Sequence, residues 1–147
     1  MSEEKKVRVA VAVILCDEKD ATNRAFKSVV VSRRPQHVHQ GGKLEFPGGK
    51  IEPEETVERA LCRELYEELG IDVLQSPKSR LTQIEHQYPD KAVFLDVWTI
   101  NGYRGKATGL EGQEVLKIAV EELDYRDFPA ANVGIIEQIR EYTVELA

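Results

Sequence analysis

Residues 49–71 read GKIEPEETVERALCRELYEELGI, and most of this stretch has the periodicity of an amphipathic helix. Its apolar side chains recur at spacings of three and four residues, at Val57, Ala60, Leu61, Leu65 and Leu69. Gly70 follows directly and suits the C-terminal cap of a helix. The stretch therefore predicts one helix whose apolar face packs on a hydrophobic core.

The same helix gathers its carboxylates along one edge. Glu68 lies four residues after Glu64, and Glu67 lies three after it, so all three side chains crowd together. Like charges about 4 Å apart repel by roughly 4 kcal/mol at an effective dielectric near 20, which predicts a cation among them. Oxygen ligands without His or Cys favour Mg²⁺ or Mn²⁺ over Zn²⁺. The alternative is a solvated acidic helix face, which is the commoner meaning of a Glu-rich helix.

The segments on either side of the helix have the patterns of strands. Residues 7–15 carry apolar side chains on both faces, which is typical of a central strand. Residues 26–32 predict a second strand, joined to the first by a long polar loop over 17–24. The remaining expected elements are strands from residue 81 onward, at 92–100 and at 114–120, and a final amphipathic helix from about 132 to 146. We therefore expect an α/β fold with helices packed against a central mixed sheet.

Composition agrees with one globular domain over residues 1–147, since 41% of the chain is hydrophobic and 31% is charged. The 20 Lys and Arg against 26 Asp and Glu give a net charge of −6, which argues against general binding of nucleic-acid polymers or anionic membranes. The longest apolar run, near residues 9–15, is far shorter than the roughly 20 residues of a membrane span. The N-terminus does not read as a secretory signal, so we expect a cytoplasmic protein. Cys16 and Cys62 lack ligand-like spacing with any histidine and are expected to be core thiols.

Seven fixed positions frame the helix, and they are Gly49, Glu55, Arg63, Glu64, Glu67, Glu68 and Gly70. This arrangement resembles the signature box of the Nudix hydrolases at each of its positions. The resemblance implies a Nudix-type α/β/α sandwich with a central mixed β-sheet and a strand-loop-helix catalytic motif. It also implies an enzyme that hydrolyses a nucleoside diphosphate linked to another group. The acidic edge agrees with that chemistry, because a metal held by carboxylates neutralises phosphate charge and lowers the pKa of a bound water.

The resemblance further implies roles for individual residues. Arg63 is expected to pair with Glu55 and to keep the carboxylates oriented. The implied metal ligands are Glu64, Glu67, Glu68, the backbone carbonyl of Gly48, and Glu111. The implied catalytic residues are Glu55, Arg63, Glu64, Glu67 and Glu111.

Four further segments, 43–50, 88–91, 111–113 and 128–132, resemble the MutT subgroup of this family. Its members are bacterial enzymes that convert 8-oxo-dGTP to 8-oxo-dGMP and pyrophosphate. In that subgroup a glutamate at the position of Glu111 reaches the metal site from a loop. The implied substrate contacts are Arg34, His39, Glu45, Phe46, Asp90 and Asn132. The polar loop over 17–24 is longer than in the shortest enzymes of this kind.

Asn132 is the expected discriminating residue for the damaged base. 8-Oxoguanine carries a proton on N7 where guanine carries a lone pair, so an amide oxygen facing N7 accepts from the damaged base only. The alternative role of Asn132 is the N-cap of the last helix, a frequent position for Asn.

Two other functions remain open at this point. The first is a Nudix pyrophosphatase acting on CTP, another pyrimidine triphosphate or a small dinucleotide, which the box cannot separate from a MutT-like enzyme. The second is a non-catalytic Nudix-like binding module, although such a module has no reason to maintain a repelling cluster of carboxylates. We expect a monomer that acts on a small nucleotide.

Overall fold

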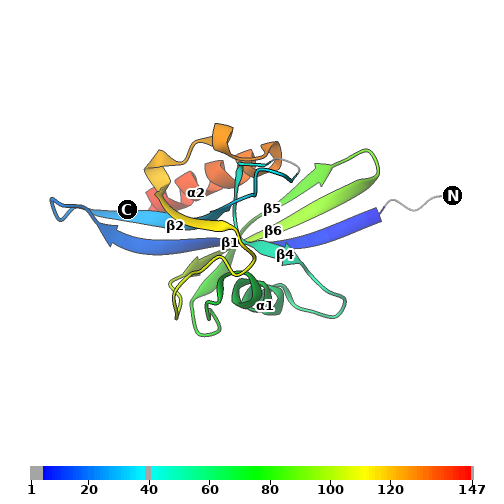
Figure 1. The fold of residues 1–147 in the computed structure, drawn as a ribbon, viewed down its shortest axis with the longest axis horizontal. Helices are drawn as coiled ribbons and strands as arrows, with labels where there is room; N and C mark the ends of the chain where they lie inside the picture. The colour runs from blue at the N-terminus through cyan, green and yellow to red at the C-terminus, as the bar shows by residue number, and fades with distance from the viewer. Residues whose placement is uncertain (1–4, 39–40, 147) are drawn as a thin grey trace.

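The computed structural model describes residues 5–38 and 41–146, through which a seven-stranded mixed sheet runs (Figure 1). The main path of the sheet has the order β3-β2-β1-β6-β5, while β4 pairs with β1 and β7 pairs with β2. The strands are β1 (Lys5–Lys19), β2 (Ala25–Arg33), β3 (Leu44–Glu45), β4 (Gly48–Lys50), β5 (Lys78–Gln87), β6 (Lys91–Asn101) and β7 (Glu114–Ala119). The helices are α1 (Val57–Leu69) and α2 (Val133–Leu146), with 3₁₀ turns η1 (Val120–Glu122), η2 (Tyr125–Asp127) and η3 (Ala130–Asn132).

β1 is the centre of this sheet, as its two apolar faces predict. It pairs in parallel with β6, from Lys5 opposite Lys91 to Leu15 opposite Asn101. On its other edge it pairs antiparallel with β4 and then, further along, with β2. Strand β1 therefore links the loop before α1 to the rest of the sheet.

The two helices cover opposite faces of the sheet (Figure 1). One face of β1 packs in a core with α2, formed by residues that include Val11, Val13, Leu15, Ile135, Ile136 and Ile139. The other face packs in a core with α1, formed by residues that include Ala10, Ala12, Ile14, Leu61, Leu65 and Leu69. The alternation of β1 side chains between faces thus builds both cores. This confirms the predicted α/β/α sandwich with a mixed sheet.

Helix α1 begins and ends where the sequence predicts. The hydroxyl oxygen of Thr56 accepts a hydrogen bond from the Arg59 N–H at 3.1 Å and caps the N-terminus. Gly70 adopts a left-handed conformation with φ of 69°, and its N–H donates to the Tyr66 carbonyl. A residue with a side chain would be strained at that φ, which explains the glycine.

Some predicted boundaries are wrong. Only residues 20–24 connect β1 to β2, because β1 extends to Lys19, into the predicted loop 17–24, and pairs there with the first residues of β2. Strand β5 begins at Lys78 rather than at residue 81, whereas α2 (Val133–Leu146) agrees with the helix expected from about 132 to 146. None of the predicted strands includes the short strands β3 and β4. Glycine has little intrinsic strand preference, so pairing with β1, and not local sequence, makes Gly48–Lys50 a strand.

Cys16 and Cys62 are half-buried free thiols that pack against the α1 core, so their predicted burial is only partial. Burial raises the pKa of both thiols, which keeps them protonated at neutral pH. No helix in the described part of the chain is both long and apolar enough to cross a bilayer.

Leu65→Ala tests whether the apolar face of α1 holds the motif on the sheet. Leu65 is 0% exposed, so we expect a loss of about 3 kcal/mol in the free energy of unfolding, measured by urea denaturation. The matched control is Tyr66→Ala at the next position, where the side chain is 67% exposed and we expect a change under about 0.5 kcal/mol. Equal losses in the two variants would contradict this packing.

Candidate active site

Strand β4 lies tightly between β1 and α1, which brings the loop before the helix against its carboxylates. Gly48 has φ of 152°, and a Cβ there would lie 2.0 Å from the Ala10 carbonyl oxygen. A Cβ on Gly49 would lie 2.3 Å from the carboxyl carbon of Glu64. Two glycines in a row are therefore required for β4 to approach both neighbours.

The side chain of Arg63 contacts the carboxylates that lie next to β4. Its Nε and Nη2 donate to the two oxygens of Glu55 at 2.8 and 2.9 Å, and Nη1 donates to Glu64 Oε1 at 2.8 Å. Nη2 also donates to the carbonyl oxygen of Lys50 at 3.0 Å, and Glu67 lies 3.5 Å from Nη1. The predicted pair of Arg63 and Glu55 is thus present. The hydrogen bonds from Arg63 lower the pKa of Glu55 to about 2, so this carboxylate stays charged.

Glu68 is a half-buried carboxylate near the end of the helix. The N–H of Gly48 donates to its Oε2 at 3.3 Å. Burial raises the pKa of Glu68 to about 8, with the charges of Glu64, Glu111 and Glu45 adding to the effect. Without a cation, this group is therefore largely protonated at neutral pH.

A pocket of about 240 Å³ opens beside Glu68 and collects residues from separate parts of the chain. It is lined by Ser32, Pro35, Glu45, Phe46, Pro47, Gly48, Glu68, Glu111 and Gln113. Five of the predicted site residues line it, namely Glu45, Phe46, Gly48, Glu68 and Glu111. Ser32 and Gln113 were missed by sequence reasoning. Gln113 lies within the MutT-like segment 111–113, so that motif is the signal that could have drawn attention to it.

The donor set of this region fits a hard divalent cation, because it offers several carboxylate oxygens, including those of the half-buried Glu68. Among the described residues, no three Asp, Glu, His or Cys side chains are arranged to chelate an ion as they stand. Glu64 and Glu67 are turned toward Arg63 instead. Glu64, Glu67, Glu68 and Glu111 are the residues that would hold such an ion.

Of the remaining predicted substrate contacts, some lie at the pocket and others lie away from it. Arg34 forms an ion pair with Glu45 at 2.9 Å, at the edge of the pocket. Phe46 is 7% exposed and stacks on Phe128 with ring centroids 5.1 Å apart, so it belongs to the α2 core as well as to the pocket. Asp90 lies in the exposed turn between β5 and β6, outside the pocket lining. His39 lies outside the described residues.

Asn132 is half-buried in η3, directly before α2, and does not line the pocket. The alternative role as an N-cap is wrong. Asn132 lies within a 3₁₀ turn that runs straight into α2, whereas an N-cap residue adopts an extended conformation. Moreover, its side chain forms no hydrogen bond to an α2 backbone N–H in the part of the chain that the structure describes.

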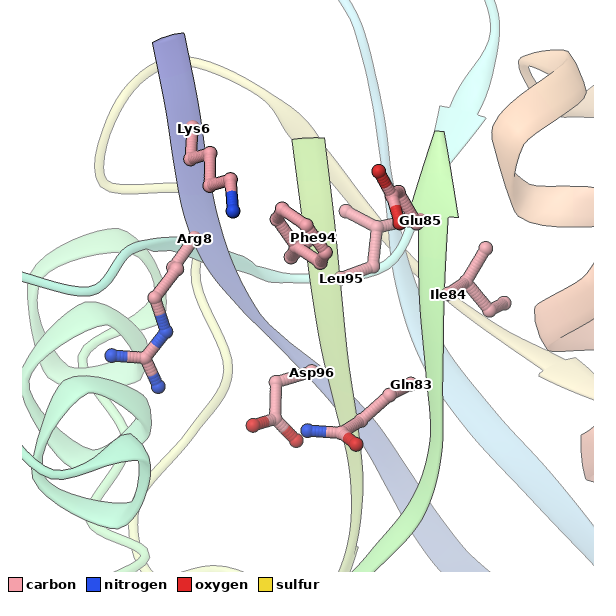
Figure 2. Close-up of a pocket in the computed structure, with 8 residues that line it drawn as sticks. All are labelled: Lys6, Arg8, Gln83, Ile84, Glu85, Phe94, Leu95 and Asp96. Atoms are coloured by element: carbon pink, nitrogen blue, oxygen red, sulfur yellow. The ribbon is translucent and has the colours of Figure 1, made fainter. Parts of the chain in front are cut away.

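A larger hollow of about 510 Å³ lies on the α1 face of β1, β5 and β6, and Figure 2 shows the side chains around it. Asp96 at its base accepts from Arg80 at 2.9 and 3.0 Å and from the indole N–H of Trp98 at 2.8 Å. Burial opposes ionisation of Asp96, but these hydrogen bonds outweigh it and lower its pKa. None of the predicted site residues lines this hollow, so its size alone does not make it the active site.

Glu68→Gln, studied in metal-free buffer, tests whether the charged form of Glu68 destabilises the folded protein. Because the pKa of Glu68 is about 8 when folded against 4.5 for the free side chain, the free energy of unfolding of the wild type falls as pH rises from about 4.5 to 8. The amide has no such titration and can still accept from Gly48. In EDTA we expect the variant to equal the wild type at pH 4 and to exceed it at pH 8 by on the order of 1 to 2 kcal/mol, which is less than the full pKa shift implies because solvent screens this half-buried group. Urea denaturation at both values checks this, and a variant less stable at pH 8 would contradict it.

Comparison with known proteins identifies the family. A family model described as "NUDIX domain" matches residues 21–138. The 8-oxo-dGTP diphosphatase of Escherichia coli (strain K12) is 36% identical over 138 residues, covering 92% of this chain and 98% of its own. The CTP pyrophosphohydrolase of the same organism is 28% identical, covering 90% of both chains. A solved structure of MutT, from work on Aliivibrio salmonicida and Vibrio cholerae, has a TM-score of 0.70 at 27% identity and covers 92% of this chain and 97% of that one. With a domain model over most of its length and relatives matching nearly all of it, the chain belongs to the Nudix hydrolases, enzymes that act on the pyrophosphate bonds of nucleotides.

Proposed function

We propose that this chain is a Mg²⁺-dependent pyrophosphohydrolase of nucleoside triphosphates, with 8-oxo-dGTP as its preferred substrate and 8-oxo-dGMP and pyrophosphate as products. The observation that supports this chemistry is the pocket, in which Glu45 and Glu111 lie beside Glu68 of α1. The 36% identity to an 8-oxo-dGTP diphosphatase, over nearly the whole of both chains, supports the choice of substrate. The role is then sanitation of the nucleotide pool and avoidance of mutations.

The chain's own residues divide the work in this proposal. When bound, Mg²⁺ or Mn²⁺ neutralises phosphate charge and makes a bound water more acidic. Glu64, Glu67, Glu68 and Glu111 hold the ion, with the Gly48 carbonyl as a further oxygen. Arg63 keeps its hydrogen bonds to Glu55 and so orients the acidic edge of the helix toward the loop.

The nucleoside end of the substrate is assigned to the other predicted contacts. Asn132 would accept from N7–H of the damaged base and donate to O6, which guanine cannot match. Arg34, His39, Glu45, Phe46 and Asp90 complete the proposed substrate contacts. The substrate is a small molecule of the cytoplasm, where we place this enzyme as a monomer.

CTP is the second candidate substrate, because the chain is also 28% identical to a CTP pyrophosphohydrolase over 90% of both chains. The deciding experiment compares kcat/KM for 8-oxo-dGTP, dGTP and CTP at micromolar concentration. The proposal expects 8-oxo-dGTP to be the best substrate. A higher value for CTP would assign the enzyme to pyrimidine nucleotides, and no hydrolysis of any triphosphate would point to a binding module.

Removal of the metal ion should abolish activity, because the anionic substrate and the carboxylates of Glu64, Glu67 and Glu68 repel each other without a cation. We expect no turnover in excess EDTA and recovery with Mg²⁺. Saturating Mg²⁺ should also raise the melting temperature, since the ion binds the folded cluster better than the unfolded chain.

Glu67→Gln should lower kcat by at least about 10-fold and leave the fold intact, because an amide keeps the volume and loses the charge. A kcat near the wild-type value in that variant would show that Glu67 does not act at the metal site.

Asn132→Ala tests the recognition of the base. The variant loses two hydrogen bonds to 8-oxo-dGTP, worth about 0.5 to 1.5 kcal/mol each, whereas dGTP was never well matched to the amide. We expect the ratio of kcat/KM for 8-oxo-dGTP over dGTP to fall toward one. Because Asn132 does not cap α2, the melting temperature should change little. An unchanged ratio would move the recognition role to other residues.

A further inference from the structure

The loop that carries Glu111 is attached to the C-terminal end of α1. The N–H of Leu110 donates to the Glu68 carbonyl at 3.0 Å, and the N–H of Thr108 donates to the Leu69 carbonyl at 3.0 Å. These carbonyls are among the last four of the helix, which have no partner within it. The loop therefore caps the helix whose side chains form the acidic edge.

Gln113 adds a side-chain link between the same two segments. Its Nε2 donates to the Glu68 carbonyl at 3.1 Å, and its Oε1 accepts from the Glu111 N–H at 2.9 Å. One amide group thus bridges the backbones of Glu68 and Glu111, two of the three residues whose carboxylates line the pocket. An amide side chain carries its donor and its acceptor on two separate atoms, and both stay uncharged over the whole accessible pH range.

The place of Gln113 in the fold makes this link firm. It directly precedes β7, which pairs with β2 from Glu114 opposite Arg33 onward. On the loop side, a Cβ on Gly109 would lie 1.8 Å from the Gln113 carbonyl oxygen, so the loop folds closely over this residue. Gln113 is therefore held by the sheet at one end and by the loop at the other.

We propose that Gln113 is a positioning residue, which holds the loop residue Glu111 beside Glu68 at the acidic edge of α1. The inference rests on the proposed function in one respect, that Glu111 acts at the metal site. Gln113 itself touches neither metal nor substrate in this proposal. Its effect passes through the backbone of Glu111.

Gln113→Met tests this role, because methionine keeps the length of the side chain and removes both hydrogen bonds. We expect amide hydrogen exchange at Glu111 to become at least about 10-fold faster. We also expect kcat to fall about 10-fold and the Mg²⁺ concentration for half-maximal activity to rise, as is usual for partners that orient metal ligands. The matched control is Gln75→Met in an exposed turn, which should match the wild type in all three measurements.

A double variant separates positioning from general loss of stability. In a Glu111→Gln background, Gln113→Met should lower kcat by less than about twofold more, because there is no loop carboxylate left to position. Multiplied losses in the double variant, or unchanged exchange at Glu111, would overturn the proposal. Faster exchange with unchanged kcat and unchanged Mg²⁺ dependence would overturn it as well.

The same variants separate this inference from the proposed function. If the wild type hydrolyses no nucleoside triphosphate, the proposed function fails, and Mg²⁺ alone then serves as the probe. A smaller Mg²⁺-induced rise in melting temperature for Gln113→Met than for Gln75→Met supports the positioning role. An equal rise overturns it.

Discussion

The guanidinium group of Arg63 is the interaction on which the rest of the site depends. It joins the Lys50 carbonyl and Glu55, which precede α1, to Glu64 and Glu67 on the helix itself. Several carboxylates crowded on one helix edge would otherwise repel each other and the loop. A planar group with five donors can satisfy these partners at once, which a lysine could not do. The arginine thus provides the positive charge that lets the acidic edge exist in the folded chain.

Three other parts of the fold hold these carboxylates in place. Strand β1 holds β4, and the glycines of β4 allow it to lie directly against Glu64. The apolar face of α1 fixes the helix on the sheet, so its opposite edge is turned to the loop and the pocket. The loop before β7 caps the end of the helix and brings in Glu111. Glu68 is half-buried among these parts at an electrostatic cost, which is the expected state of a site that works with a cation.

In the proposed function, the residues assigned to hydrolysis and those assigned to the choice of base lie in different parts of the chain. The carboxylates belong to α1 and to the segments that touch it, and the family assignment explains why they are gathered there. Asn132 and Asp90 lie outside the pocket that those carboxylates line. Two relatives with different named substrates, an 8-oxo-dGTP diphosphatase and a CTP pyrophosphohydrolase, are similar to this chain over at least 90% of its length.

The sequence by itself determined the helix 57–69 with its glycine cap, the central strand, the α/β class and the Nudix box, because periodicity and fixed spacing are local properties. It also predicted the pair of Arg63 and Glu55, which lie within one motif. Only the tertiary structure decided that Gly48–Lys50 is a strand, since that depends on a partner far away in sequence. The bridge from Gln113 to Glu68 likewise joins residues 45 positions apart, and no local pattern records it. The burial of Glu68, and with it the raised pKa, is set by how β4, α1 and the loop pack together, because desolvation depends on all the atoms around a group and not on its neighbours in the chain.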